Sequence, residues 1–176
     1  MIEIRHETPF EAARREALLD EAFGDCRFAK TAERLRQDRL PEEGLSFLAC
    51  ADGRLVGTVR LWAVAAGPGR PALLLGPLAV APDFRHRGVG GDLMWHALGE
   101  ARQRGHRAVL LVGDAPYYGR FGFSTEKTGA LRLPGPYARD RLLACELVPG
   151  ALDGVRGLVS ATGRSEPRLD SAARAA

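Results

Sequence analysis

The chain has 176 residues, of which 45% are hydrophobic and 27% charged, and this composition is typical of one globular domain with a sizeable core. Its net charge of +3 at pH 7 comes mostly from scattered arginines rather than a basic block, which argues against a nucleic-acid partner. No apolar run approaches the roughly 20 residues that span a bilayer, and the N-terminus lacks the pattern of a secretory signal, so we expect no membrane association and a cytoplasmic location.

The cysteines give no sign of a metal site or a disulfide framework. Cys26, Cys50 and Cys145 form no CxxC pair, and neither they nor the histidines have the spacing of metal ligands. We therefore expect free thiols in a reducing compartment and no bound metal.

The first predicted elements are a strand and a helix. Ile2 to Glu7 alternates apolar and polar residues, as a strand does. Thr8 can cap the helix that follows, Pro9 suits its first position, and Glu11 completes a capping box. We predict that this helix runs to about Phe23.

A second, short helix is predicted from Thr31 to Leu40, because Pro41 cannot continue it. A short apolar strand follows from Leu45 to Ala51. The pair Asp52-Gly53 then predicts a hairpin into the alternating strand Leu55 to Ala65.

The middle of the chain predicts a parallel crossover. Ala72 to Val80 is almost continuously apolar, which indicates a strand buried on both faces. A helical pattern begins at Val89, and Gly105 is a suitable stop. The apolar segment Ala108 to Val112 predicts the next strand, and the order strand, helix, strand implies a right-handed parallel connection. The residues expected on the buried face of the helix are Val89, Leu93, Met94, Ala97, Leu98 and Ala101.

The last third of the chain has weaker patterns. We predict a short helix around Pro116 to Phe121 and two strands near Ala130–Leu133 and Leu142–Val148. We expect a single domain over residues 1–159 and a polar C-terminal tail over residues 160–176. Whether the domain forms a homodimer is left open.

A glycine-rich turn joins the buried strand to the central helix, and it is the strongest functional signal. Its sequence is Arg85-His86-Arg87-Gly88-Val89-Gly90-Gly91. The first turn of a helix presents unpaired N–H groups that can bind a diphosphate, and the two arginines add positive charge. The alternative is a turn that only connects two elements. A P-loop would need Gly-Lys-Ser/Thr, and a Rossmann fingerprint would follow the first strand, so neither motif fits.

The segment Arg85-x-x-Gly88-x-Gly90 resembles the Arg/Gln-x-x-Gly-x-Gly/Ala signature of the GNAT superfamily of N-acetyltransferases. The preceding segment Leu78–Pro82 looks like the fourth strand of that family. Tyr117–Phe123 is similar to its aromatic-Tyr-x-Arg/Lys-x-Gly-Phe segment, and the phrase Gly113–Tyr118 looks like a bacterial subgroup of predicted N-acetyltransferases. The resemblance covers about Ile2 to Val148.

This resemblance implies a mixed α/β (α+β) fold in which a twisted mixed sheet of about seven strands is flanked by helices, with the fourth and fifth strands splayed apart. It also implies acetyl-CoA or CoA as co-substrate, with its pantetheine arm in the gap. The residues expected to bind the coenzyme are Leu78, Ala79 and Val80 for the pantetheine, and Arg85, His86, Arg87, Gly88, Val89, Gly90 and Gly91 for the pyrophosphate.

The resemblance further implies that Tyr118 is the general acid that protonates the departing thiolate; the alternative is a packing role. The family's usual carboxylate on the fourth strand is absent, so the base is open between a water relay and Asp114, Glu21, Asp25 or Glu146. The acceptor is expected to be a small-molecule or peptide amine. A non-catalytic acyl-CoA-binding regulatory module is the alternative to an enzyme.

Three aromatic residues are either core residues or the lining of an acceptor pocket. They are Phe23, Phe28 and Trp62.

Overall fold

The computed structural model describes residues 1–167, and residues 168–176 of the expected tail lie outside them. A mixed sheet of eight strands has the order β1-β2-β3-β4-β5-β7, with β8 paired to β3 and β6. The strands are β1 (Ile2–His6), β2 (Ser46–Ala51), β3 (Arg54–Ala66), β4 (Pro71–Val80), β5 (Ala108–Val112), β6 (Leu131–Arg132), β7 (Leu142–Glu146) and β8 (Gly157–Ala161). The expected fold class is confirmed, with eight strands where about seven were predicted.

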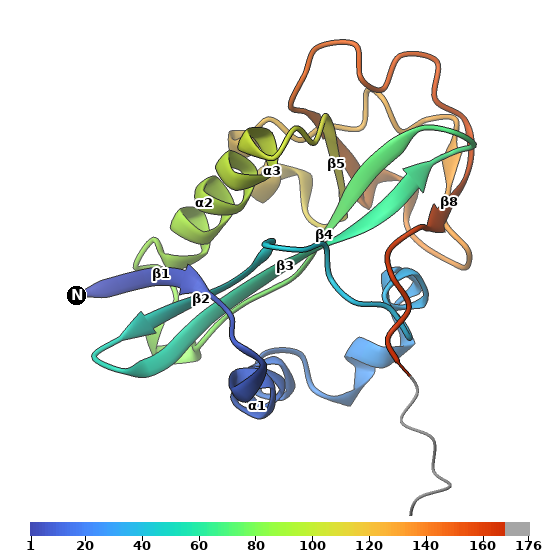
Figure 1. Ribbon diagram of the computed structural model, residues 1–176. Coiled ribbons are helices and arrows are strands. Elements are labelled where there is room, and N and C mark those ends of the chain that lie inside the picture. The colour runs from blue at the N-terminus through green and yellow to red at the C-terminus, as the bar shows by residue number, and fades with distance from the viewer. Residues whose placement is uncertain (168–176) are drawn as a thin grey trace, which may run out of the picture.

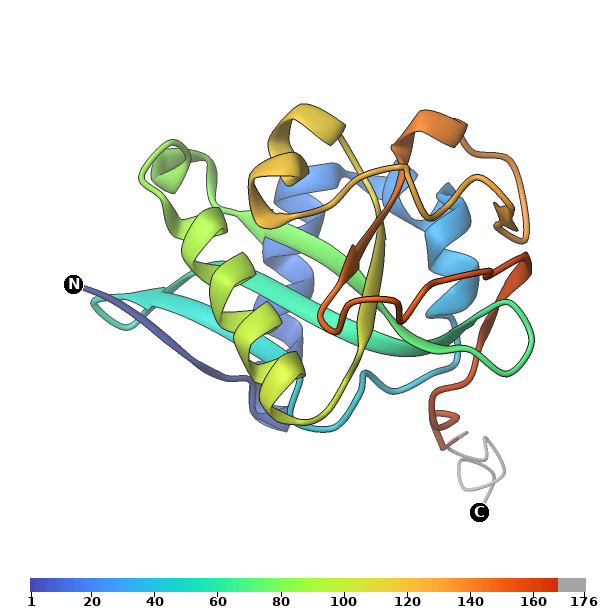
Figure 2. The same cartoon turned by 90° about the horizontal axis from the view of Figure 1, so that it is seen from above.

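Helices cover both faces of this sheet (Figures 1 and 2). The α-helices are α1 (Ala12–Phe23), α2 (Val89–Gln103) and α3 (Ala115–Tyr118). Short 3-10 helices are η1 (Pro9–Glu11), η2 (Asp25–Ala29), η3 (Thr31–Leu35), η4 (Pro82–Phe84), η5 (Gly119–Phe121) and η6 (Arg139–Arg141). α2 and α3 lie on one side of the sheet, and α1 lies on the other side (Figure 1). No helix within residues 1–167 is long and apolar enough to cross a membrane.

The N-terminal capping box is present, although it opens a 3-10 turn before α1 begins. The Thr8 N–H donates to Glu11 Oε2 at 3.0 Å, and Arg5 forms an ion pair with the same carboxylate. Glu11 is only 9% exposed. The hydrogen bond from Arg5, followed by that from Thr8, lowers the pKa of Glu11 to about 2.

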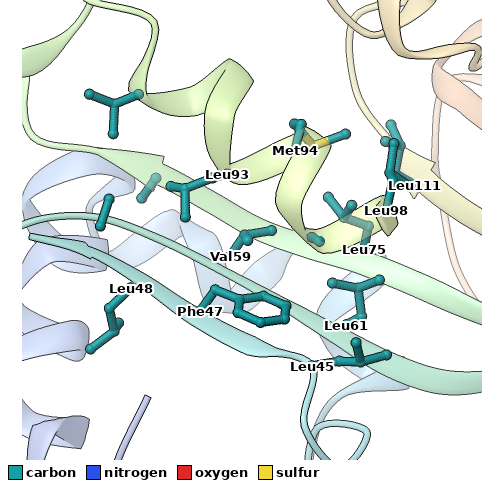
Figure 3. Packing of buried hydrophobic residues seen from close by; sticks show 14 of the residues in the cluster. Leu45, Phe47, Leu48, Val59, Leu61, Leu75, Leu93, Met94, Leu98 and Leu111 are labelled. Carbon is teal, nitrogen blue, oxygen red and sulfur yellow. The ribbon is translucent and has the colours of Figure 1, made fainter. Parts of the chain in front are cut away.

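The central helix packs its apolar face on the sheet as its periodicity predicted. All six residues expected on that face are buried. Leu93, Met94 and Leu98 lie against side chains of β2, β3 and β4 (Figure 3). The helix approaches β3 closely at Gly57, where a Cβ atom would lie 2.9 Å from Leu93 Cδ1.

A bulge in β4 separates it from β5. Val59 of β3 pairs with Leu78, whereas Leu61 pairs with Leu75, so β4 contains one extra residue around Gly76. The parallel pairing with β5 covers only Leu73 with Val109 and Leu74 with Leu110. Beyond Leu74 the two strands diverge, which confirms the predicted splay.

Two segments differ from the sequence-based expectations. The second helix is the 3-10 helix η3 and ends at Leu35, because the chain beyond it bonds to the C-terminal segment instead; the Leu40 N–H, for example, donates to Arg164 O at 2.8 Å. Strand β8 was not predicted, and the boundary expected after residue 159 falls inside it. It forms because β3 offers it an unpaired edge at 64–66.

Candidate active site

The predicted anion loop lies between β4 and α2 and presents backbone amides. Its left-handed conformation begins at His86, with φ of 62°, and Gly88 at the helix N-cap has φ of 86°. The Asp92 N–H donates to Gly88 O at 3.0 Å, which is the first backbone bond of the helix. The amides of Val89, Gly90 and Gly91 therefore have no partner in α2 and are available to an anion.

The positive charges of the two arginines in this loop are not neutralised by a carboxylate among residues 1–167. Both Arg85 and Arg87 are exposed, and neither has an ion-pair partner among residues 1–167. The one acid of the turn, Asp83, is already paired with Arg54, whose Nη1 lies 2.5 Å from Asp83 Oδ2. This pairing holds the pKa of Asp83 below its ordinary value and leaves the loop with net positive charge.

Gly90 is required by its neighbour Tyr117. A Cβ atom at Gly90 would lie 2.8 Å from the Tyr117 hydroxyl and 3.6 Å from Val80 Cγ2. The side chain of Tyr117 thus reaches from α3 to the start of α2. This contact joins the two motifs, which are about 30 residues apart in sequence, into one site.

The divergence of β4 and β5 opens a cavity of about 530 Å³. The bulged part of β4 forms one wall of the cavity, and the end of β5 with the turn at Gly113 forms another. Tyr118 of α3 lines the cavity at one end, and residues of η2 and η3 form a further wall. The volume is within the usual range for small-molecule sites.

The side chain of Tyr118 is held at this gap by glycine. Any Cβ atom at Gly113 would overlap the Tyr118 ring, so only glycine lets the ring lie there. The hydroxyl forms no hydrogen bond within the described part of the chain, and it is free to act on a bound group. Burial, followed by the nearby Tyr117 and Asp114, raises the pKa of Tyr118 to about 12. Its hydroxyl is therefore neutral at physiological pH.

The four carboxylates proposed as bases lie in different environments in the fold. Asp114 lines the cavity, and its Oδ1 accepts from Arg141 Nη1 at 2.6 Å. Glu146 instead accepts the N–H groups of Gly150 and Leu152, which makes it a capping residue. Glu21 and Asp25 are exposed and do not line the cavity.

The cavity wall contains ionic residues that the sequence did not single out. Glu33 and Arg36 of the η3 region face the cavity and form an ion pair, with 3.0 Å between Arg36 Nη2 and Glu33 Oε2. Of the three aromatic candidates, Phe23 lines this cavity. Trp62 is buried, and its Nε1 donates to Gly76 O at 2.6 Å, which supports the bulge; it also lines a second cavity of about 810 Å³. Phe28 is 57% exposed and lines the second cavity rather than the first.

The cysteines and the potential metal ligands lie apart in the part of the chain that the structure describes. All three cysteines are free, and two of them are buried. No group of three potential metal ligands occurs within residues 1–167.

Comparison with known proteins identifies relatives over nearly the whole chain. The acetyltransferase (GNAT) family profile matches residues 9–123. The uncharacterized N-acetyltransferase YhbS of Escherichia coli K12 is 33% identical over 158 residues, covering 89% of this chain and 93% of that protein. The uncharacterized N-acetyltransferase YjhQ of the same strain is 35% identical over 120 residues, covering 66% of this chain and 65% of that protein.

Two solved structures share the fold and contain the coenzyme. The crystal structure of E. coli YhbS in complex with CoA has a TM-score of 0.77 and 32% identity, covering 92% of this chain and 89% of that chain. A GNAT family acetyltransferase from Brucella melitensis in complex with acetyl-CoA has a TM-score of 0.67 and 27% identity, covering 92% of this chain and 96% of that chain.

Proposed function

The chain belongs to the acetyltransferase (GNAT) family, and from this premise we propose that it transfers the acetyl group of acetyl-CoA directly to a primary amine, with Tyr118 as general acid. The observation that carries the proposal is that Tyr118 lines the cavity between β4 and β5 while its hydroxyl has no hydrogen-bond partner among residues 1–167. The anion loop opens at the end of the same β4 strand.

The coenzyme would bind across these two features. The free amides from His86 to Gly91 would bind the pyrophosphate, with Arg85 and Arg87 adding charge. The pantetheine arm would lie along the free edge of β4. Leu78, Ala79 and Val80 pair with β3 on one side only, because the β5 pairing ends at Leu74. This edge would offer the arm backbone hydrogen bonds like those of an added strand.

The reaction requires a neutral amine. A lysine-like amine with a pKa near 10.4 is less than about 0.1% neutral at pH 7, so the site must accept its proton before attack. We propose a water relay for this step, which ends at bulk solvent or at the cavity carboxylate of Asp114. The amine nitrogen then attacks the thioester carbonyl carbon and forms a tetrahedral intermediate.

The nitrogen of the intermediate loses a proton to the same water relay, and collapse then breaks the carbon–sulfur bond and releases a thiolate. A thiol of this kind has a pKa near 8.5, so protonation assists its departure at neutral pH. Tyr118 would donate its hydroxyl proton to the sulfur and would recover a proton from solvent. The products are the acetylated amine and free CoA.

The test is a screen of primary amines with acetyl-CoA, in which released thiol is measured and the acetylated product is identified by mass. We expect at least one small-molecule or peptide amine to be acetylated, and Tyr118→Phe to slow that reaction. If CoA binds but no amine in a broad library is acetylated, the catalytic proposal is wrong and the chain is an acyl-CoA-binding module. A cytoplasmic location is part of the same proposal.

A further inference from the structure

The lining of the cavity has more basic than acidic residues. Four basic residues and two acidic residues line the cavity. The basic ones are Arg27, Lys30, Arg36 and Arg141, and the acidic ones are Glu33 and Asp114. Such a surplus of positive charge favours a ligand that carries an anionic group.

Two of the four basic side chains already form ion pairs with carboxylates of the protein. Arg27 Nη2 lies 2.5 Å from Glu16 Oε2 and 2.9 Å from Asp20 Oδ1. Arg141 pairs with Asp114. Neither needs a further anion, so they contribute little to the selection of an acceptor.

Arg36 has donors that the protein does not use. The side chain is buried, with 9% exposure; its Nε donates to Glu33 Oε2 at 3.1 Å, and its Nη2 lies 3.0 Å from the same oxygen. Nη1 has no hydrogen-bond partner within residues 1–167. It lies 3.3 Å from the position of a Cβ atom on Gly76, at the bulge where β4 leaves β5. Burial lowers the pKa of Arg36 in spite of Glu33, so the protein stabilises this cation incompletely.

Lys30 is a second cation that can bind an added anion. Its Nζ lies 4.6 Å from the centre of the Phe23 ring, and it has no ion pair within the described chain. Lys30 is exposed and Arg36 is buried, although both line the same cavity. An acceptor that enters from this side would meet Lys30 in the exposed part and Arg36 in the buried part.

We propose that the acceptor is a small primary amine that carries a carboxylate, which Arg36 and Lys30 bind while the amine faces the gap beside Tyr118. The inference rests on the proposed acetyl transfer. Planar guanidinium groups bind carboxylates well, and a carboxylate in the cavity could accept from Nη1, a donor that no residue among 1–167 uses. The cavity volume of about 530 Å³ must also admit the end of the pantetheine, which leaves room for an amino acid or a similarly small molecule.

The test compares matched acceptors. Amino acids, their C-terminal amides and the corresponding aminoalkyl phosphonates are each assayed with acetyl-CoA, and kcat/KM is measured for each member of a set. We expect an amino acid to exceed its amide by about 10- to 100-fold, the range typical of a charged hydrogen bond. Equal rates for the acid and the amide would overturn the inference and leave acetyl transfer intact. Preference for the phosphonate would overturn the carboxylate assignment.

Variants locate the binding group. Arg36→Lys should lower kcat/KM for the acid about tenfold or more and leave the amide unchanged, because the planar fork is lost while the charge stays. Because Lys30 is exposed, Lys30→Gln should not change the free energy of unfolding appreciably. It should raise KM for the acid by about 2- to 5-fold. Arg102→Gln, at an exposed position of α2, removes one positive charge away from the cavity and should change neither. Equal losses for acid and amide in both cavity variants would contradict the inference. Failure of every acceptor would overturn the proposed function and this inference together.

Discussion

Removal of the Tyr118 hydroxyl separates catalysis from coenzyme binding. Tyr118→Phe keeps the ring, which lies against Gly113, and removes only the proton donor. Because that hydroxyl has no hydrogen-bond partner among residues 1–167, its loss leaves no protein group unsatisfied. The free energy of unfolding should therefore change by less than about 0.5 kcal/mol. CoA affinity should also change little.

The magnitude follows from the pKa of the donor. A well-matched general acid contributes about 10²- to 10⁴-fold. Burial raises the pKa of Tyr118 to about 12, well above that of the thiol. A donor so weak is expected at the low end, and Tyr118→Phe should slow the chemical step by about 10- to 100-fold. The deficit should shrink as the pH rises toward about 8.5, where the thiolate leaves with less assistance.

The assay is single-turnover acetylation of one accepted amine across pH 6 to 9.5, because slow product release could hide a chemical effect in steady-state rates. Tyr137→Phe is the matched control, since Tyr137 lines the same cavity and its hydroxyl donates to Leu131 O at 3.1 Å. The control should lose about 1 kcal/mol of stability and keep its chemical rate. Identical single-turnover rates for Tyr118→Phe and the unmodified protein would refute the general-acid role.

Three further substitutions test other parts of the site and fold. Gly90→Glu should weaken CoA binding at least about tenfold in calorimetry, because its Cβ atom meets the Tyr117 hydroxyl and its carboxylate repels the diphosphate; unchanged affinity would contradict the assignment of the loop. Gly113→Ala should displace the Tyr118 ring and slow the chemical step at least as much as Tyr118→Phe, and a fully active variant would contradict the role of this glycine. For Glu11, the folded-state pKa of about 2 lies below the ordinary value of 4.5, so its stabilising effect is complete above pH 4.5 and lost as the pH falls toward 2. Urea unfolding of Glu11→Gln should thus show a weaker loss of stability between pH 5 and 2 than the unmodified protein, and parallel curves would exclude this carboxylate as a source of acid sensitivity.

Features encoded by neighbouring residues could be predicted from the sequence. The order of β4, the glycine turn and α2 follows from apolar runs and glycine positions within one short segment. The splay of β4 and β5 came instead from the family resemblance. In the structure the two strands diverge at the bulge around Gly76, and the hydrophobic pattern of β4 does not predict a bulge there.

Features made by distant segments could not be predicted. Arg36 belongs to the η3 region, yet it lies beside Gly76, 40 positions later in the chain. Its short 3-10 helix carries no periodic pattern that would specify this packing. Strand β8 was not predicted for a similar reason. Its own residues have no clear strand pattern, and it forms by pairing with the edge of β3 at 64–66. The glycines were expected to admit a diphosphate, whereas Gly90 also makes room for Tyr117.

The most direct test of the account is a crystal structure of this protein with CoA. The account predicts the pyrophosphate on the amides from His86 to Gly91, the pantetheine between β4 and β5, and the sulfur within about 3.5 Å of the Tyr118 hydroxyl. A coenzyme bound outside the gap, or a sulfur remote from Tyr118, would contradict it.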